Sequence, residues 1–242
     1  MKKNLFLIVM MILSSYSFAQ YTLNDPLPEN GYFKGKVQSL DAEGYVENGK
    51  KVGNWVFYHT NGIIARIENY KKDVLHGIKV TMDFRGYMRK VEKYNNGVID
   101  GLVTEYKIGG RKLLEEHYVN GYKDGMCKVF YDDNGKLQEA SQYKNGKKHG
   151  VSNWYYNTGK LLATYHYNMN RFEGEQKSFH PNGRLWMLSN YKNNKLNGVY
   201  KEWDNKGHLI YTGHYKDDEK VGEWIRMDNK GKVIERKQYK NG

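Results

Sequence analysis

The chain has 242 residues, and its 39 lysine and arginine residues against 27 aspartate and glutamate residues give a formal net charge of +12. The 22 tyrosines, 26 glycines and only 3 prolines are typical of an aromatic-rich β protein interrupted by turns, which argues against a mainly helical fold. A basic balance favours anionic partners. The lysines are spread along the chain, however, so a solvated surface explains them equally well, and nucleic acid is not an expected partner.

The first 19 residues have the pattern of a cleavable secretory signal peptide. Two lysines precede an apolar run from Leu5 to Leu13, and Ser17-Phe18-Ala19 fits the small-residue cleavage rule. The apolar run is too short to span a bilayer as a mature helix, and no later stretch approaches the roughly 20 apolar residues required. We therefore expect an exported protein of the periplasm, cell envelope or extracellular space, which is not transmembrane after signal removal.

Residues 20–34 show no repeat and are expected to form an N-terminal linker, whereas residues 35–52 match a shortened capping copy of the unit that follows. Residues 53–242 then contain eight copies of a 24-residue unit. One extra residue falls within residues 131–134, which are expected to form a turn, where an insertion does the least damage.

Three columns of this repeat hardly vary. The first is a glycine, at Gly53, Gly77, Gly101, Gly125, Gly150, Gly174, Gly198 and Gly222. The second is a turn glycine, at Gly62, Gly86, Gly110, Gly135, Gly159, Gly183, Gly207 and Gly231. The third is a tyrosine that closes each unit, at Tyr70, Tyr94, Tyr118, Tyr143, Tyr167, Tyr191, Tyr215 and Tyr239.

Each unit reads as a β-hairpin, because apolar and aromatic residues follow the first glycine, an Asn-Gly-like turn comes next, and about eight residues lead to the tyrosine. The turn glycine supplies the positive φ that such a turn needs. One hairpin cannot stand alone in water, so the units must stack. Each adds two strand spacings, about 9.6 Å, and eight give a ribbon roughly 75 Å long. The predicted fold is all-β: an elongated, single-layer antiparallel β-meander.

The fifth residue after each first glycine is large and apolar in all eight copies, which predicts the core stripe. These residues are Tyr58, Met82, Tyr106, Phe130, Tyr155, Phe179, Trp203 and Met227.

On the opposite strand face the sequence places aromatic residues that are absent from some units. They are Trp55, Phe57, Trp154, Tyr156, Tyr200 and Trp224. Because the repeat does not require them, they are candidates for a partner surface that binds peptide, glycan or lipid headgroup. The competing interpretation is cross-strand aromatic packing that stiffens a thin sheet.

Two consecutive stretches carry a family resemblance: they are residues 143–150 (YKNGKKHG) and 154–161 (WYYNTGKL). They resemble MORN repeats, most closely the bacterial antitoxin-type variant, and the likeness covers about residues 31–242. The resemblance implies a single-layer antiparallel β-meander that serves as an interaction or membrane-proximal scaffold rather than as a catalyst.

Outside the repeat columns, the sequence shows no group of residues at a spacing that indicates catalysis or metal binding. His117, His166 and His214 share one column, but two-unit spacing separates neighbours by about 19 Å, whereas zinc needs all its ligands within ~2.3 Å. Cys127 is the sole cysteine and has no internal disulfide partner. No catalytic, cofactor-binding or metal-binding residue is predicted, and no cofactor is expected.

The sequence therefore predicts a non-enzymatic, exported repeat scaffold that binds a protein or peptide partner at the cell envelope or outside the cell. The alternative is a basic peripheral binder of anionic lipid or glycan, through lysine-rich connections between units. A further alternative is an antitoxin or immunity-type inhibitor of a toxin, although an intracellular inhibitor has no need of a signal peptide.

Overall fold

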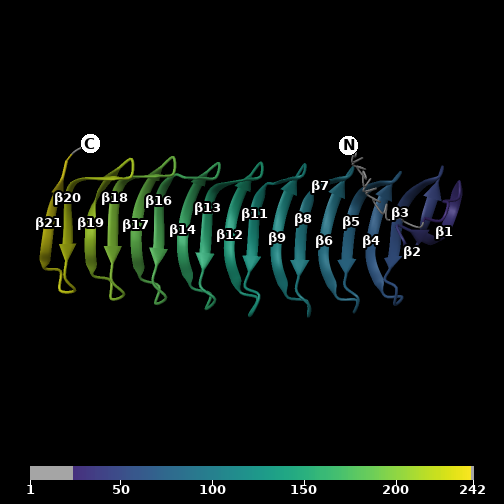
Figure 1. Cartoon of the computed structure of the whole chain (residues 1–242), viewed down its shortest axis with the longest axis horizontal. Helices are drawn as coiled ribbons and strands as arrows, with labels where there is room; N and C mark the ends of the chain where they lie inside the picture. Colours follow the sequence, from purple (N-terminus) through teal and green to yellow (C-terminus); the bar gives the residue numbers. More distant parts are fainter. Residues whose placement is uncertain (1–23, 241–242) are drawn as a thin grey trace, which may run out of the picture.

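In the computed structural model, residues 24–240 form one open antiparallel sheet in which each hairpin lies beside the next (Figure 1). This confirms the predicted single-layer β-meander. The predicted signal peptide, residues 1–19, lies outside the described residues. Within them, no helix is long and apolar enough to cross a membrane.

The N-terminal hairpin consists of β1 (Asn30–Val37) and β2 (Leu40–Glu47). The eight repeat hairpins are β3 (Lys50–Tyr58) with β4 (Ile64–Lys71), β5 (Val74–Met82) with β6 (Met88–Asn95), β8 (Gly101–Tyr106) with β9 (Lys112–Val119), β11 (Gly125–Phe130) with β12 (Leu137–Lys144), β13 (Lys147–Tyr155) with β14 (Leu161–Asn168), β16 (Gly174–Phe179) with β17 (Leu185–Lys192), β18 (Lys195–Trp203) with β19 (Leu209–Lys216), and β20 (Glu219–Met227) with β21 (Val233–Tyr239). Short strands open three of these units: β7 (Val98–Ile99), β10 (Tyr122–Lys123) and β15 (Arg171–Phe172).

The boundary predicted between linker and capping copy is wrong. β1 begins at Asn30, inside the segment predicted as linker, and the capping copy is a complete hairpin. The hairpin was missed in the sequence because its turn, Gln38-Ser39, has no glycine, whereas the internal turn of each repeat hairpin has one. Gln38 and Ser39 take positive φ values of 53° and 65° instead.

The two glycine columns have different structural causes. The turn glycine closes the loop inside each hairpin: the Gly62 N–H donates to the His59 carbonyl over 2.8 Å, with φ at +80°. The first glycine lies in a β-bulge between units, where Glu68 pairs with Lys79 but Tyr70 pairs with Leu75. Gly77 adopts φ +111° in this bulge, a conformation that strains any residue with a Cβ.

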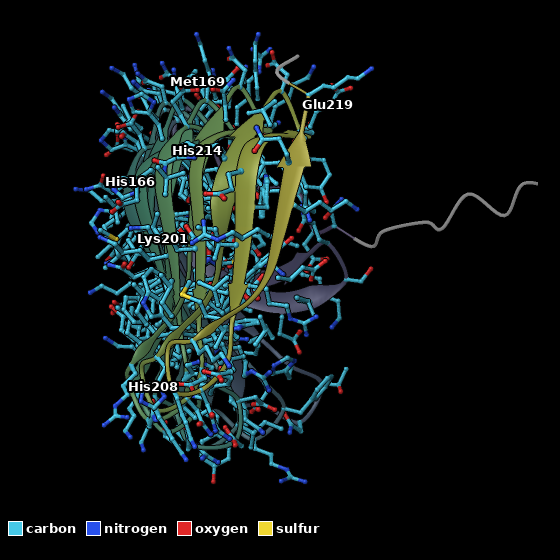
Figure 2. The ribbon with its side chains drawn as sticks, turned by 90° about the vertical axis from the view of Figure 1, so that its left-hand side faces the viewer. His166, Met169, Lys201, His208, His214 and Glu219 are labelled. Atoms are coloured by element: carbon cyan, nitrogen blue, oxygen red, sulfur yellow. The ribbon has the colours of Figure 1, made fainter. Side chains whose placement is uncertain are left out.

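Strand alternation separates two faces of the sheet. Trp55 pairs with Glu68, and the closing tyrosine, Tyr70, lies two residues further along the same strand. The second and fourth residues after the first glycine therefore share a face with the tyrosine column, and we call this face the inner face. The first, third and fifth residues lie on the outer face. Figure 2 looks along the array from its C-terminal end, and the side chain of His166 projects from the outer face at the left.

The core lies on the inner face, so the prediction that the fifth-position column forms it is wrong. All eight fifth-position residues are only half-buried. Trp55, Phe57 and Trp224, on the inner face, are 0%, 1% and 2% exposed. In a single layer a side chain is covered only by neighbours on its own face, and rings from adjacent hairpins lie over one another on the inner face. The fifth position instead lies beside the internal turn, where its strand ends.

Candidate interaction surfaces

Three of the six aromatic residues predicted as a partner surface are core residues. Trp55, Phe57 and Trp224 are buried, which overturns their assignment to an exposed surface and favours cross-strand packing instead. Both tryptophans also donate their indole N–H to a backbone carbonyl: Trp55 to Tyr45 over 3.0 Å and Trp224 to His214 over 3.2 Å. The other three residues, Trp154, Tyr156 and Tyr200, are half-buried. The Tyr156 hydroxyl donates to the Phe179 carbonyl of the next unit over 2.7 Å.

Four lysines belong to this core rather than to the solvated surface. The Lys148 ammonium lies 4.9 Å from the ring centroid of Trp154 and 5.4 Å from that of Tyr167, and its Nζ is 2.5 Å from the Glu139 carboxylate. Its column, two residues before the first glycine, holds Lys51, Leu75, Ile99, Lys123, Lys148, Phe172, Leu196 and Lys220. The aliphatic part of each lysine thus takes the place of an apolar side chain between aromatic rings. Cation–π contacts and carboxylates stabilise the ammonium groups.

Seven of the closing tyrosines have raised pKa values, which should make the stability of the fold decrease at high pH. Burial raises the pKa of Tyr143 to about 12, from an ordinary value of 10.0. Burial also raises the pKa of Tyr70, Tyr94, Tyr118, Tyr167, Tyr191 and Tyr215. The unfolded chain therefore loses its phenol protons first. We expect the stabilisation to be complete below about pH 10 and to be lost as the pH rises to about 12.

An alkaline titration followed by far-ultraviolet circular dichroism and by tyrosinate absorbance checks this. These seven tyrosines should ionise only as the sheet signal disappears. Ionisation of all the tyrosines near pH 10 with the sheet signal intact would contradict it.

The outer face carries an exposed apolar patch over three consecutive units. We call these seven residues the outer apolar patch: Val74, Ile78, Val98, Leu102, Val119, Tyr122 and Met126. Ile78 is 57% exposed and Tyr122 62%. Strand parity places them together, because Lys79 pairs with buried Glu92 on the inner face, so its neighbour Ile78 points outward.

A hollow of about 360 Å³ lies in the same units of the sheet, but none of the seven patch residues lines it. His76, Lys93 and Asp100 line it, and it opens between units where Gly77 and Gly101 have no side chain. On the outer face Lys93 pairs with Ile78 and His117 pairs with Leu102, so exposed polar side chains lie between the apolar ones. Such a mixture of apolar and polar groups is typical of protein-binding surfaces.

In the later units the turns that connect the hairpins carry unpaired cations. We call Lys144, Lys147, Arg171, Lys192 and Lys195 the basic edge. Lys144 faces Lys147 and Lys192 faces Lys195 directly across the strands, although like charges in that position destabilise a sheet. Within residues 24–240 none of the five makes an ion pair.

The nearby acids accept hydrogen bonds from the backbone instead of forming ion pairs with this basic edge. The Glu173 carboxylate accepts from the Asn193 N–H over 2.9 Å, and the Asp218 carboxylate accepts from the Leu196 N–H over 2.7 Å. These bonds tie each connecting turn to the next.

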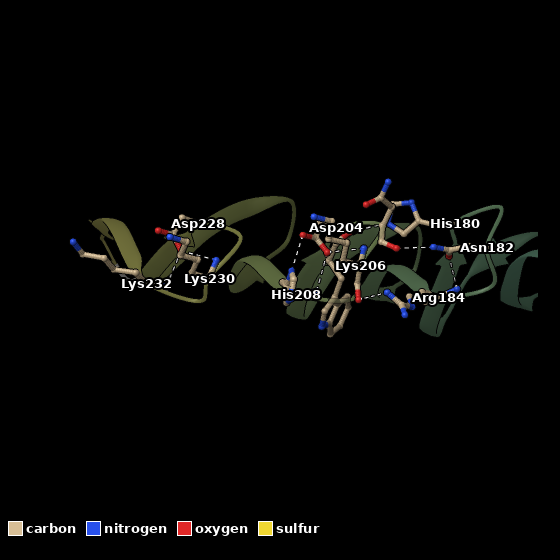
Figure 3. Close-up of polar contacts among 11 residues, drawn as sticks. His180, Asn182, Arg184, Asp204, Lys206, His208, Asp228, Lys230 and Lys232 are labelled. Atoms are coloured by element: carbon tan, nitrogen blue, oxygen red, sulfur yellow. Dashed lines mark hydrogen bonds and ion pairs between the residues drawn. The ribbon is translucent and has the colours of Figure 1, made fainter.

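At the opposite ends of the strands, the internal turns hold each other in register (Figure 3). The Asn182 side-chain amide donates to the Asn205 carbonyl over 2.5 Å, and Arg184 donates to the Lys206 carbonyl. This ladder is structural. In the part of the chain that the structure describes, no three His, Cys, Asp or Glu side chains come together to hold a metal ion.

An open array of stacked hairpins, with its functional groups on strips and shallow hollows, defines the chain as a β-repeat protein. A family model described as MORN repeat variant matches residues 51–72, 127–145, 148–169, 172–193 and 196–217. The chain is therefore a MORN-repeat protein, and repeats of this kind are protein- or membrane-binding modules. No curated protein matches the sequence.

The matched segments leave a gap at residues 73–126, and every residue of the outer apolar patch lies in this gap. The hairpins there keep the repeat geometry, since β5–β6 and β8–β9 pair like the others. The stretch also keeps the glycine and tyrosine columns of the repeat. Sequence analysis missed the patch, although Val74, Val98 and Tyr122, at one unit spacing, signal it.

Proposed function

We propose that the chain is an exported, non-enzymatic binding module that holds a protein or peptide partner on the outer apolar patch. The observation that carries this is the exposure of seven apolar residues on one face of three consecutive units. Exposed apolar side chains gathered on one face are unfavourable in water unless a partner covers them. Export rests on the signal-peptide pattern of residues 1–19, and N-terminal sequencing of the protein recovered from envelope and medium tests it.

The combined change Ile78→Lys and Leu102→Lys should abolish partner binding. Two ammonium groups would have to be desolvated under the partner, so the affinity should fall at least about 100-fold, which corresponds to about 2.7 kcal/mol. The free energy of unfolding should change by no more than about 0.5 kcal/mol, because both side chains are exposed.

Cross-linked capture from envelope and medium, compared between this variant and the unchanged protein, measures the effect. Val199→Lys is the matched control, because Val199 holds the same repeat position outside the patch. Capture of the same partner at the same yield by the double variant would contradict the proposal.

A second candidate function, binding of anionic lipid or glycan, is favoured by the basic edge. Lys192 and Lys195 are kept opposite each other and line a surface hollow with Asn193 and Asn197, which is an arrangement that an anion would stabilise.

Lys192→Glu with Lys195→Glu should reduce co-sedimentation with anionic vesicles or acidic glycan about 10-fold or more at ~50 mM salt, where screening is weakest. The control is Lys230→Glu with Lys232→Glu, which makes the same charge change beside the internal turns (Figure 3). Equal losses in both double variants would show only a response to net charge, and no binding by the unchanged protein would remove this candidate.

A further inference from the structure

The two ends of the array differ in how their outermost strand is covered. Residues 24–29 run along β1: the Asp25 N–H donates to the Lys36 carbonyl over 2.8 Å, and the Lys36 N–H donates to the Asp25 carboxylate over 2.6 Å. Gly35 makes room for this contact, because a Cβ there would lie 2.6 Å from the same carboxylate oxygen. The N-terminal edge of the sheet is thus capped by the chain itself.

The other outermost strand, β21, has no such cover. It pairs with β20 from Gly222–Tyr239 to Met227–Val233, and within residues 24–240 no segment lies along its other side. All its residues except Tyr239 are exposed, and it contains no proline. A strand edge of this kind presents backbone N–H and C=O groups that can pair with another chain.

We infer that two copies of this chain pair through β21, antiparallel and about a two-fold axis at Arg236. In β21 Glu235, Lys237 and Tyr239 share the inner face, since Lys237 pairs with Trp224 and Glu235 with Arg226. Pairing centred on Arg236 sets Glu235 of each copy opposite Lys237 of the other.

Charge selects this register over its neighbours. A pairing centred on Glu235 places two carboxylates opposite each other, and one centred on Lys237 places two ammonium groups opposite each other, both of which are unfavourable. Arg236 faces its own copy on the outer face, but the Glu223 carboxylate, 2.7 Å away, offsets its charge. The register centred on Arg236 is therefore favoured because it forms two Glu235–Lys237 pairs, which offset the single contact between like charges.

Capping of β1 sets the size of the assembly. Head-to-tail stacking of β21 on β1 would give open filaments, but residues 24–29 occupy the β1 edge. A two-fold pairing of β21 with itself closes at two copies. This inference is independent of the outer apolar patch, which lies in β5–β11, far along the array from β21 (Figure 1).

Sedimentation velocity over about 1 to 200 μM measures the association. The unchanged chain should show a monomer–dimer equilibrium. Lys237→Glu and Glu235→Lys, each of which sets like charges opposite one another, should each raise the dissociation constant at least about 10-fold. An equimolar mixture of the two variants should recover the original affinity, because both pairs between positions 235 and 237 are then of opposite sign. Lys230→Glu is the control and should leave the dimer unchanged.

Circular dichroism establishes that all variants are folded. Three results would overturn the inference: a chain that stays monomeric over the whole range, a dimer that neither variant weakens, or oligomers larger than two.

Discussion

Replacing Trp55 by alanine should lower the free energy of unfolding of the N-terminal repeats by about 3–5 kcal/mol, the usual range for deletion of a buried tryptophan. The Trp55 side chain is fully buried, its ring stacks on Phe33 at 5.5 Å, and it packs against Phe57 at 6.3 Å. Its indole N–H also donates to the Tyr45 carbonyl, which would lose its partner.

The effect should be local, because each hairpin contacts only its neighbours and stability is a sum of nearest-neighbour terms. Hydrogen exchange read by mass spectrometry should show lost protection in β1–β4 and unchanged protection in β18 and β19. Trp186→Ala is the matched control, since Trp186 is 45% exposed. Equal loss of protection along the whole array would show that the repeats unfold as a single unit and would contradict this expectation.

Gly213→Ala should destabilise the C-terminal repeats by about 1–3 kcal/mol, because the added methyl overpacks the core. An ideal Cβ on Gly213 would lie 2.2 Å from Cδ2 of Trp224, a distance that forces the indole ring to move. The φ of Gly213 is not in the left-handed region, so the expected effect is steric and not conformational.

A double-mutant cycle isolates this contact. In a Trp224→Ala background, Gly213→Ala should have almost no effect, because the space that the indole filled is empty, and the coupling free energy should approach the whole single-variant effect. Urea denaturation of the four proteins measures it. Additive losses would contradict the steric account, and Thr212→Ala, at the adjacent outer-face position, is the control.

Much of this architecture could be predicted because the same structural position recurs at a fixed interval and requires the same residue type each time. The glycine and tyrosine columns gave the number of repeats, the hairpins and the single-layer meander. The N-terminal hairpin was misplaced because it has no glycine at its turn, and Gln38 and Ser39 take positive φ instead.

The assignment of the core face failed for a physical reason. At the second position after the first glycine, the inner face holds residues as different as Lys79, Cys127, Ser152 and Gln176, so no apolar stripe is visible there. Burial on that face comes from the tyrosine column, lysine stems and carboxylates that hydrogen bond to one another. The fifth position was predicted to form the core because it is apolar in every unit, but its side chains are only half-buried in the single layer.

Two glycines outside the repeat columns carried a signal for the true core. Gly44 and Gly213 stand at the same distance before Trp55 and Trp224, and at both sites a Cβ would collide with the indole ring. A glycine paired at fixed spacing with a tryptophan indicates that the ring lies flat on the neighbouring strand. Recognising that pairing would have moved both tryptophans from the candidate partner surface into the core.

Small-angle X-ray scattering of the dilute protein tests the central claim, that the chain is one open layer of hairpins held together along its inner face. Nine hairpins advancing about 9.6 Å each give an elongated particle with a radius of gyration of about 25 Å. A compact globule of the same size would have a radius of gyration of about 17 Å. A value near 25 Å with the pair-distance profile of a rod is the expected result, and a value near 17 Å would contradict the account.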